Sequence, residues 1–444
     1  DWSRGVRLGQ AAISGRVGLA TDELAESIYL VWVAEEKQLG AEFLRFVRLD
    51  RSGHILDERG LPIGVDRPTQ VEVAVDQHGH LHLTWVDRVA GIRRLIYARL
   101  DASGRLASYP RPVSLPGVMV ESYAVGLGPS GGVDLFWGAK EGEQAGLYHV
   151  KLDRWGETTA ENLDLGVNGF DPAFRTDRHG ISHLVWMDEP DYGEHHLHYA
   201  TFDGKRRALS RPSEIASFPA PTGLIAHRPS LGLAGDDVYI FWSLERRGGG
   251  LSRPSARSSY VAFPLGHPDM AGKPRRVQIP PLNQPTYGVA KSQFHVEGLA
   301  STTQSPVCSE FVYFPWTNQG HHDELVTAFA VELVGRTRGI VQVVLALWGD
   351  GELKGYQIVG ETRSSSLRPM LIADTNSDLH LAWIDTAGFG KYSVYYASTS
   401  SEARASLNRI TVQDVAIVII GLIWGVAQAL SLFPVALGWL FPPF

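Results

Sequence analysis

The chain has 444 residues, of which 44% are hydrophobic and 20% are charged, as expected for a folded protein with a sizeable core. Its net charge of -7 argues against a nucleic-acid partner, because proteins that bind nucleic acids usually present a basic face. The 47 glycines, 12 tryptophans, 15 tyrosines and 17 phenylalanines favour short strands and tight turns over helices.

The single cysteine, Cys308, cannot form an intrachain disulfide, and we expect it to be an unreactive thiol. The chain begins at Asp1 rather than Met, so we expect a signal peptide or a signal anchor upstream of it.

A repeat runs along the chain. Its clearest copies, residues 72–85, 173–186 and 370–383, each place Asp nine positions and His three positions before a Trp. Counting weaker copies, the repeated tryptophans lie 53, 52, 49, 56, 74 and 67 residues apart. A period near 50 is typical of a propeller blade of four strands. The repeated tryptophans are Trp32, Trp85, Trp137, Trp186, Trp242, Trp316 and Trp383.

One repeat unit predicts the strands of one blade. Residues 71–75 read as the innermost strand, 76–79 as an Asp-x-x-Gly turn, and the second strand ends at Trp85. An aromatic third strand follows at 95–101, and similar segments occur at 147–153, 197–203 and 394–398. The fourth strand is short and poorly marked. We therefore predict an all-β fold, a β-propeller of about seven four-stranded blades over residues 1–410, although six or eight blades also fit the spacing.

Two segments depart from the repeat. Residues 243–290 are rich in Gly, Pro and Ser, and we predict a long insertion or loop there, between blades five and six. Blade six continues with strong apolar runs at 325–333 and 340–348. We expect residues 1–10 to complete the last blade and close the ring.

The C-terminal segment, residues 411–444, is predicted to span a membrane. Residues 415–433 carry no charge, and 19 helical residues would cover about 28 Å, the thickness of a bilayer core. The alternative is a buried core helix. We expect the propeller to be extracytoplasmic, either periplasmic or on the cell surface, with the lipid bilayer and other membrane-protein subunits as partners. The anchor residues are Val415, Ile419, Trp424, Leu430 and Phe433.

The unit A-x-D-x-x-G-x-x-H-L-x-W, followed by an aromatic third strand, resembles the repeats of sialidase-like propellers of the Asp-box class over most of residues 10–400. In that class the Asp box lies between the third and fourth strands. Here the Asp-Gly turn lies between the first and second strands, and the later turns lack the Ser and Trp of the box. The resemblance therefore implies the fold and no activity.

The starts of innermost strands point toward the central funnel of a propeller. Arginine side chains bind carboxylates through two parallel hydrogen bonds, so an arginine cluster there predicts a site for an anionic ligand such as a glycan. Sialidase-like enzymes are similar in using such a cluster. Alternatively, each Arg-Pro pair only enters a strand, and the Arg pairs with a neighbouring acid. No catalytic residue is assigned. The predicted rim residues are Arg67, Glu121, Asp171, Arg228 and Arg368.

No metal or cofactor is predicted. The repeated His82, His183 and His380 occupy equivalent positions in different blades, too far apart to share one ion. The clusters 194–198 and 321–323 contain Glu, Asp and His without a recognisable ligand spacing. The run Asp374-x-Asn376-x-Asp378 resembles the start of a calcium loop, but Leu379 stands where a Gly is expected, so we predict a turn. These clusters are Glu194, His195, His196 and His198, and His321, His322 and Asp323.

The first functional hypothesis is a membrane-anchored protein-binding or scaffold module that is a subunit of a larger membrane complex and not an enzyme. The alternative is a sialidase-like glycoside hydrolase or a glycan-binding protein that uses the central funnel. A third hypothesis is an assembly factor for outer-envelope proteins. The chain contains no Walker loop, no dinucleotide-binding glycine motif and no Gly-x-Ser-x-Gly elbow.

Overall fold

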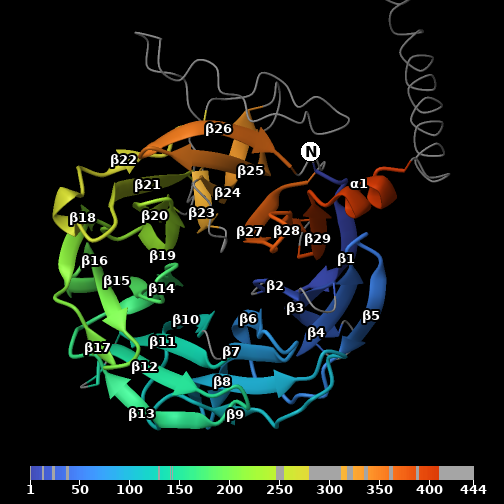
Figure 1. Ribbon diagram of the computed structural model, residues 1–444, viewed down its shortest axis with the longest axis horizontal. Coiled ribbons are helices and arrows are strands. Elements are labelled where there is room, and N and C mark those ends of the chain that lie inside the picture. Colours follow the sequence, from blue (N-terminus) through green and yellow to red (C-terminus); the bar gives the residue numbers. More distant parts are fainter. Residues whose placement is uncertain are drawn as a thin grey trace, which may run out of the picture.

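A computed structural model of the chain describes residues 2–409 with gaps at 13–14, 23–25, 37–39, 129–130, 141, 143, 247–254, 280–311, 318–323, 335–338, 360–363 and 387–389. The described residues form seven antiparallel sheets arranged in a ring around a central axis (Figure 1). This arrangement is a seven-bladed β-propeller, which confirms the predicted fold class.

Each blade runs outward from the axis as a four-stranded meander. The innermost strands are β2 (Gly18–Asp22), β6 (Thr69–Val75), β10 (Ser122–Leu127), β14 (Phe170–Thr176), β19 (Leu224–Ala234), β23 (Val312–Thr317) and β27 (Ser366–Ala373). The second strands are β3 (Ser27–Glu36), β7 (Leu81–Val89), β11 (Val133–Ala139), β15 (Ser182–Asp191), β20 (Asp237–Arg246), β24 (Leu325–Val334) and β28 (Leu379–Thr386).

The third strands are β4 (Ala41–Asp50), β8 (Ile92–Leu100), β12 (Gly146–Leu152), β16 (Glu194–Asp203), β21 (Ser255–Pro264), β25 (Gly339–Gly349) and β29 (Tyr392–Ser398). The outer strands are β5 (Ile55–Gly60), β9 (Arg111–Pro112), β13 (Thr158–Asp164), β17 (Ala208–Leu209) with β18 (Ser213–Pro219), β22 (Arg275–Arg276), β26 (Glu352–Ile358) and β1 (Val6–Ala11). A 3-10 turn, η1 (Pro268–Met270), and one short helix, α1 (Ser401–Leu407), complete the described elements.

The N-terminal segment closes the ring, as predicted. Strand β1 pairs with β29 from Val6 opposite Tyr396 to Ala11 opposite Tyr392, so the last blade combines both ends of the propeller. The amide of Ser3 also donates to the carbonyl of Ser398 at 2.7 Å. Joining the first and last strands in one sheet stabilises the whole ring, because it fixes both ends of the propeller chain in a single blade.

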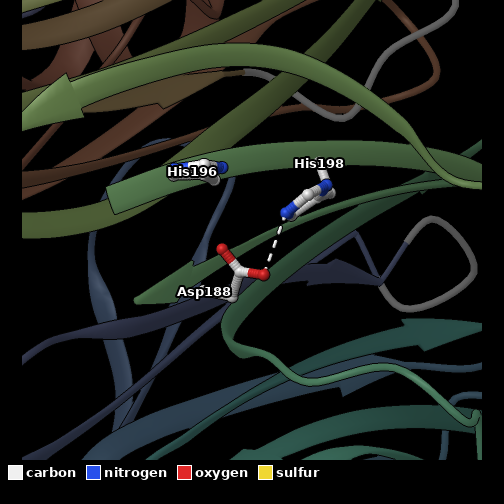
Figure 2. A group of neighbouring side chains, drawn as sticks. All are labelled: Asp188, His196 and His198. Carbon is white, nitrogen blue, oxygen red and sulfur yellow. Dashed lines mark ion pairs between the residues drawn. The ribbon is translucent and has the colours of Figure 1, made fainter. Parts of the chain in front are cut away.

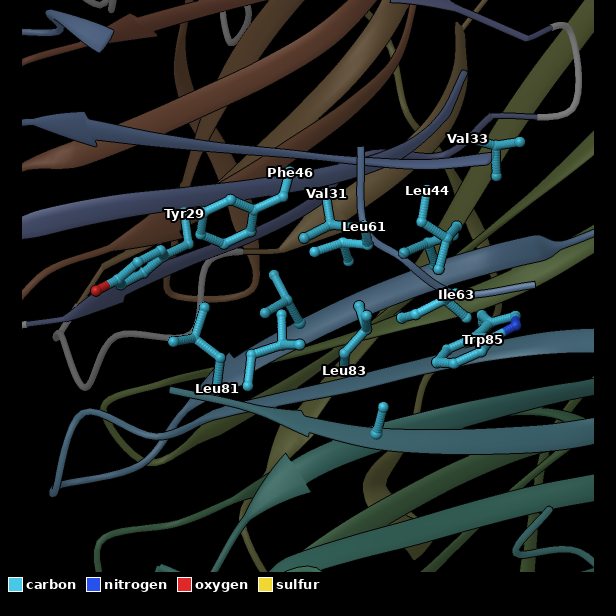
Figure 3. Close-up of a cluster of buried hydrophobic side chains, with 14 of the residues drawn as sticks. Tyr29, Val31, Val33, Leu44, Phe46, Leu61, Ile63, Leu81, Leu83 and Trp85 are labelled. Carbon is cyan, nitrogen blue, oxygen red and sulfur yellow. The ribbon is translucent and has the colours of Figure 1, made fainter. Parts of the chain in front are cut away.

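Apolar side chains fill the spaces between neighbouring blades. Figure 3 shows one such layer, in which Tyr29, Val31 and Phe46 of the first blade face Leu81 and Trp85 of the second. Trp85 is 1% exposed. Since a single blade buries too little apolar surface to be stable, each blade depends on these contacts with its neighbours.

Two predictions about blades five and six were wrong. Strands β21 and β22 lie within 243–290, so this segment supplies half of blade five rather than a continuous insertion. Its Gly- and Pro-rich flanks had masked a third strand that contains two aromatic residues, Tyr260 and Phe263. Trp316 lies in the innermost strand β23, and Phe329 of β24 occupies the position of the repeated Trp in blade six.

The predicted Asp turns are present and share one hydrogen-bond pattern. Oδ1 of Asp76 accepts from the amides of His78 at 2.8 Å and His80 at 2.9 Å. Oδ1 of Asp374 accepts likewise from the amides of Asn376 at 2.9 Å and Asp378 at 2.8 Å. The segment that resembles a calcium loop is therefore a turn, as predicted.

The repeated histidines are structural, as predicted. Nδ1 of His82 lies 2.8 Å from the hydroxyl of Tyr97, and its Nε2 lies 3.5 Å from Oδ2 of Asp76. His183 and His380 make the same contacts with Tyr199 and Tyr396 and with the Asp of their own turns. Burial lowers the pKa of His82 to about 4, so its neutral form is favoured in the folded protein.

Several predictions concern residues outside the described part of the chain. These are the cluster His321, His322 and Asp323, the thiol of Cys308, and the anchor residues Val415, Ile419, Trp424, Leu430 and Phe433. Within the described residues, no helix is long and apolar enough to cross a membrane.

Candidate functional site

A β-bulge recurs at the start of five innermost strands. In each, two residues of the innermost strand lie opposite one residue of the second strand, which bends the innermost strand and redirects its side chains. The single opposing residue is always the aromatic residue of the repeat. These bulges lie opposite Trp85, Trp186, Trp242, Phe329 and Trp383.

The first residue is polar in four of the five bulges, and three of these four residues adopt a backbone conformation that is rare for residues other than glycine. Gln70, Asp171 and Arg368 have φ angles of 54°, 53° and 53°. Such strained residues persist where surrounding contacts hold them, and they occur often at binding sites. Here the hydroxyl of Ser122 accepts from the amide of Asp171 at 2.8 Å. Proline follows Asp171, Arg228 and Arg368, which a bulge tolerates because the regular hydrogen-bond ladder is interrupted there.

The bulges surround a cavity of about 260 Å³ at one end of the innermost strands. The polar residues that line it come from several blades, so no single blade can form the site. They are Arg16, Gln70, Glu121, Asp171, His227, Arg228 and Arg368.

Four of the five predicted rim residues line this cavity, and Arg67 does not. Arg67 is exposed in the loop before β6, and Gln70 occupies the bulge position of that blade. A sequence signal was available, because Gln70, Asp171 and Arg368 each lie 15 residues before the Trp of their blade. The Arg-Pro pair at 67–68 instead favoured Arg67 as the rim residue of blade two. Arg16 was also missed, since no proline follows it.

Two ion pairs connect the lining of the cavity to neighbouring side chains. Nη1 of Arg228 donates to Oε1 of Glu72 at 2.9 Å, and its Nε donates to the carbonyl of Pro172 at 2.9 Å. Nη1 of Arg93 lies 3.2 Å from Oε2 of Glu121. Glu72 and Glu121 are therefore each paired with an arginine.

Two further arginines belong to the same group. Burial and the nearby charge of Arg228 lower the pKa of Arg16 to about 10. Nη1 of Arg368 donates to the carbonyl of Gly15 at 3.1 Å, which directs this guanidinium toward the segment that carries Arg16. Counting the lining residues together with Glu72 and Arg93, their ion-pair partners, gives four arginines and three acids, so the local charge is positive.

The predicted cluster at 194–198 is divided between the two faces of β16. His195 stacks on the ring of Phe218, with 5.8 Å between centroids. His196 and His198 lie on the opposite face, where Asp188 of β15 joins them. None of these residues lines the axial cavity.

Comparison with protein families finds no matching family model, and comparison with curated proteins finds no match. Among solved structures, the chain is similar to an ulvan lyase, a polysaccharide lyase, with a TM-score of 0.52 and 8% identity over 91% of this chain and 99% of that one. It is also similar to an α-L-arabinanase of Penicillium chrysogenum, with a TM-score of 0.44 and 12% identity over 74% and 93% of the two chains.

The NanB sialidase of Streptococcus pneumoniae is similar with a TM-score of 0.41 and 10% identity, over 90% of this chain and 70% of that one. At such identities a likeness shows the fold alone. The resemblance to sialidase-like propellers predicted from the repeats is confirmed at the level of the fold, and no activity follows from it.

Proposed function

We propose that the axial cavity binds an acidic sugar, a single uronate-type unit at the end of a glycan. The observation that supports this most directly is the convergence of Arg16, Arg228 and Arg368, from three different blades, on one cavity that also contains Asp171 and Gln70.

The residue types suit both parts of such a ligand. A guanidinium binds a carboxylate through two parallel hydrogen bonds. The carboxylate of Asp171 and the amide of Gln70 offer acceptors and donors to sugar hydroxyls. In the described part of the chain, Oε1 of Gln70 is buried without a hydrogen-bond partner, and a ligand hydroxyl that reached it would satisfy this atom.

The size of the cavity limits the ligand. Its volume of about 260 Å³ is close to the lower end of typical ligand pockets, about 300 Å³. One sugar unit therefore suits it better than a longer chain segment. The ulvan lyase with a similar fold was solved with a GlcA-containing saccharide bound, and we propose the same broad class of ligand here.

Isothermal titration with glucuronate and galacturonate oligosaccharides, and with the matching neutral oligosaccharides, tests the proposal. We expect binding of the acidic compounds only, and a loss of about tenfold or more in affinity for Arg368→Ala. The affinity of Arg368→Lys should lie between those of the wild type and Arg368→Ala. Lysine keeps the positive charge but lacks the planar guanidinium that forms two parallel hydrogen bonds.

The matched control is Arg211→Ala, which removes an exposed arginine that also precedes a proline but lies outside the cavity. Equal affinity for acidic and neutral sugars, or equal losses in the Arg368 and Arg211 variants, would exclude this function.

The membrane-anchored scaffold function remains a separate prediction, since it depends on residues 411–444. Purification from native membranes in mild detergent, followed by identification of copurifying subunits, tests it. A chain that purifies alone argues against a complex subunit.

A further inference from the structure

We propose that Asp188, His196 and His198 form a binding site for a divalent transition-metal ion such as zinc, on blade four and separate from the axial cavity. The three residues come from the two central strands of the blade, β15 and β16.

The sheet register brings the three side chains together. Asp188 lies directly opposite His196 across the β15–β16 pair, and His198 follows two residues later on the same face of β16. One ligand atom from each residue lies within 4.8 Å of the other two, and Figure 2 shows Asp188 and His198 pointing toward each other, with His196 on the same strand as His198.

Two buried polar atoms at this site have no hydrogen-bond partner. Nε2 of His198 is 3.1 Å from Oδ2 of Asp188, but it makes no hydrogen bond within the described part of the chain, and neither does Oδ1 of Asp188. Leaving such buried atoms unsatisfied is costly, and a bound ion would account for them. A metal between the imidazole and the carboxylate would satisfy both atoms.

Neighbouring residues hold the two imidazoles as a metal site requires. Nδ1 of His196 lies 3.2 Å from Oε2 of Glu214, and its Nε2 lies 3.5 Å from Oε1 of Glu194, an exposed carboxylate that an ion could displace. The ring of His198 stacks on Trp186, with 5.6 Å between centroids. The side chains of Asp188, His196 and His198 are 22%, 22% and 18% exposed, so an ion and a coordinating water have access.

The ligand set selects the class of ion. Two imidazoles and one carboxylate suit zinc, copper, nickel, cobalt or ferrous iron, whereas calcium and magnesium prefer oxygen ligands only. In a tetrahedral zinc site, neighbouring ligand atoms lie about 3.3 Å apart. Small side-chain rotations would therefore close the site around the ion.

The decisive experiment is a titration of untagged, chelator-treated full-length protein with Zn²⁺ by calorimetry and with Co²⁺ by visible absorption. We expect one ion per chain, a Co²⁺ absorption band in the visible range, and quenching of Trp186 fluorescence by Co²⁺. His198→Gln and His196→Gln should each weaken binding more than tenfold, and Glu214→Gln by about tenfold.

The control variant is His179→Gln, an exposed histidine in a turn of the same blade. Circular dichroism of each variant establishes that it is folded, and zinc should raise the unfolding temperature of the wild type while magnesium should not. Absence of stoichiometric binding by the wild type, or undiminished binding by folded His196 and His198 variants, would overturn the proposal. In that case Asp188 and His198 form an ordinary ion pair.

Discussion

Nη1 of Arg228 donates to Oε1 of Glu72 at 2.9 Å, which joins blade five to blade two although the residues are 156 positions apart in sequence. Their strands, β19 and β6, lie on opposite sides of the central axis in Figure 1. The two side chains are only 13% and 10% exposed. The pair therefore links two distant blades near the central axis, and its arginine is one of the cations that line the axial cavity.

Glu72→Ala should lower the free energy of unfolding by about 3–5 kcal/mol, because it leaves the buried charge of Arg228 without its carboxylate. Urea denaturation measures this effect. Glu58→Ala is the control, since Glu58 pairs with Arg45 at a site where both side chains are about one-third exposed. Its effect should stay within about 1 kcal/mol. Similar effects of both substitutions would show that the buried pair is not a structural link.

Trp383→Ala should destabilise the protein by about 3–5 kcal/mol, because Trp383 is 1% exposed and lies opposite the bulge that carries Arg368. Trp383→Phe should cost clearly less, since Phe329 occupies this position in blade six and is fully buried. Thermal unfolding monitored by circular dichroism compares the two. Trp155→Ala, at a position 49% exposed, is the control. If the Phe variant is as unstable as the Ala variant, the indole itself is required there.

Gly104→Ala should destabilise the protein by more than Gly91→Ala. Both glycines have positive φ angles, 75° and 83°, so the backbone cost of about 1 kcal/mol is common to both. Only at Gly104 would the new Cβ lie within 2.9 Å of ring atoms, those of the buried Phe46, which adds about 1–3 kcal/mol. Denaturant midpoints measure the difference, and equal losses would contradict the predicted overlap.

Acid should destabilise the protein between pH 6.5 and about 4. Burial lowers the pKa of His82 from 6.5 to about 4, so the unfolded chain binds more protons in this interval and stability rises with pH across it. Burial also lowers the pKa of His183 and of His149, which adds to the same trend. His82→Gln should reduce the slope of unfolding free energy against pH. A slope equal to that of the wild type would show that His82 does not contribute.

Removal of residues 411–444 should release the protein from membranes, because residues 415–433 contain no charge and match the bilayer core in length. Carbonate washing and fractionation of cells that express either form provide the measurement. Replacing the same segment with a polar linker of equal length is a suitable control. Full-length protein that washes off, or truncated protein that stays bound, would contradict the anchor.

Much of the fold followed from local sequence patterns. The period of the repeat, the Asp turns and the role of residues 1–10 were predictable because strands alternate in polarity and Asp and Gly have fixed uses in turns. The same rules failed for 255–276, where Gly- and Pro-rich stretches flank strand β21 although it contains Tyr260 and Phe263.

What the sequence determined by itself was the architecture and the kinds of residue near the axis, since both repeat with the blade. The tertiary structure alone decided which polar residues share a cavity, because the bulge of blade two begins at Gln70, three residues after Arg67, and only Gln70 of the two lines the cavity. It also decided that Asp188 joins His196 and His198, while the adjacent His195 turns away. Both outcomes depend on pairing between strands, and the register of that pairing is set by the packed sheet rather than by either strand alone.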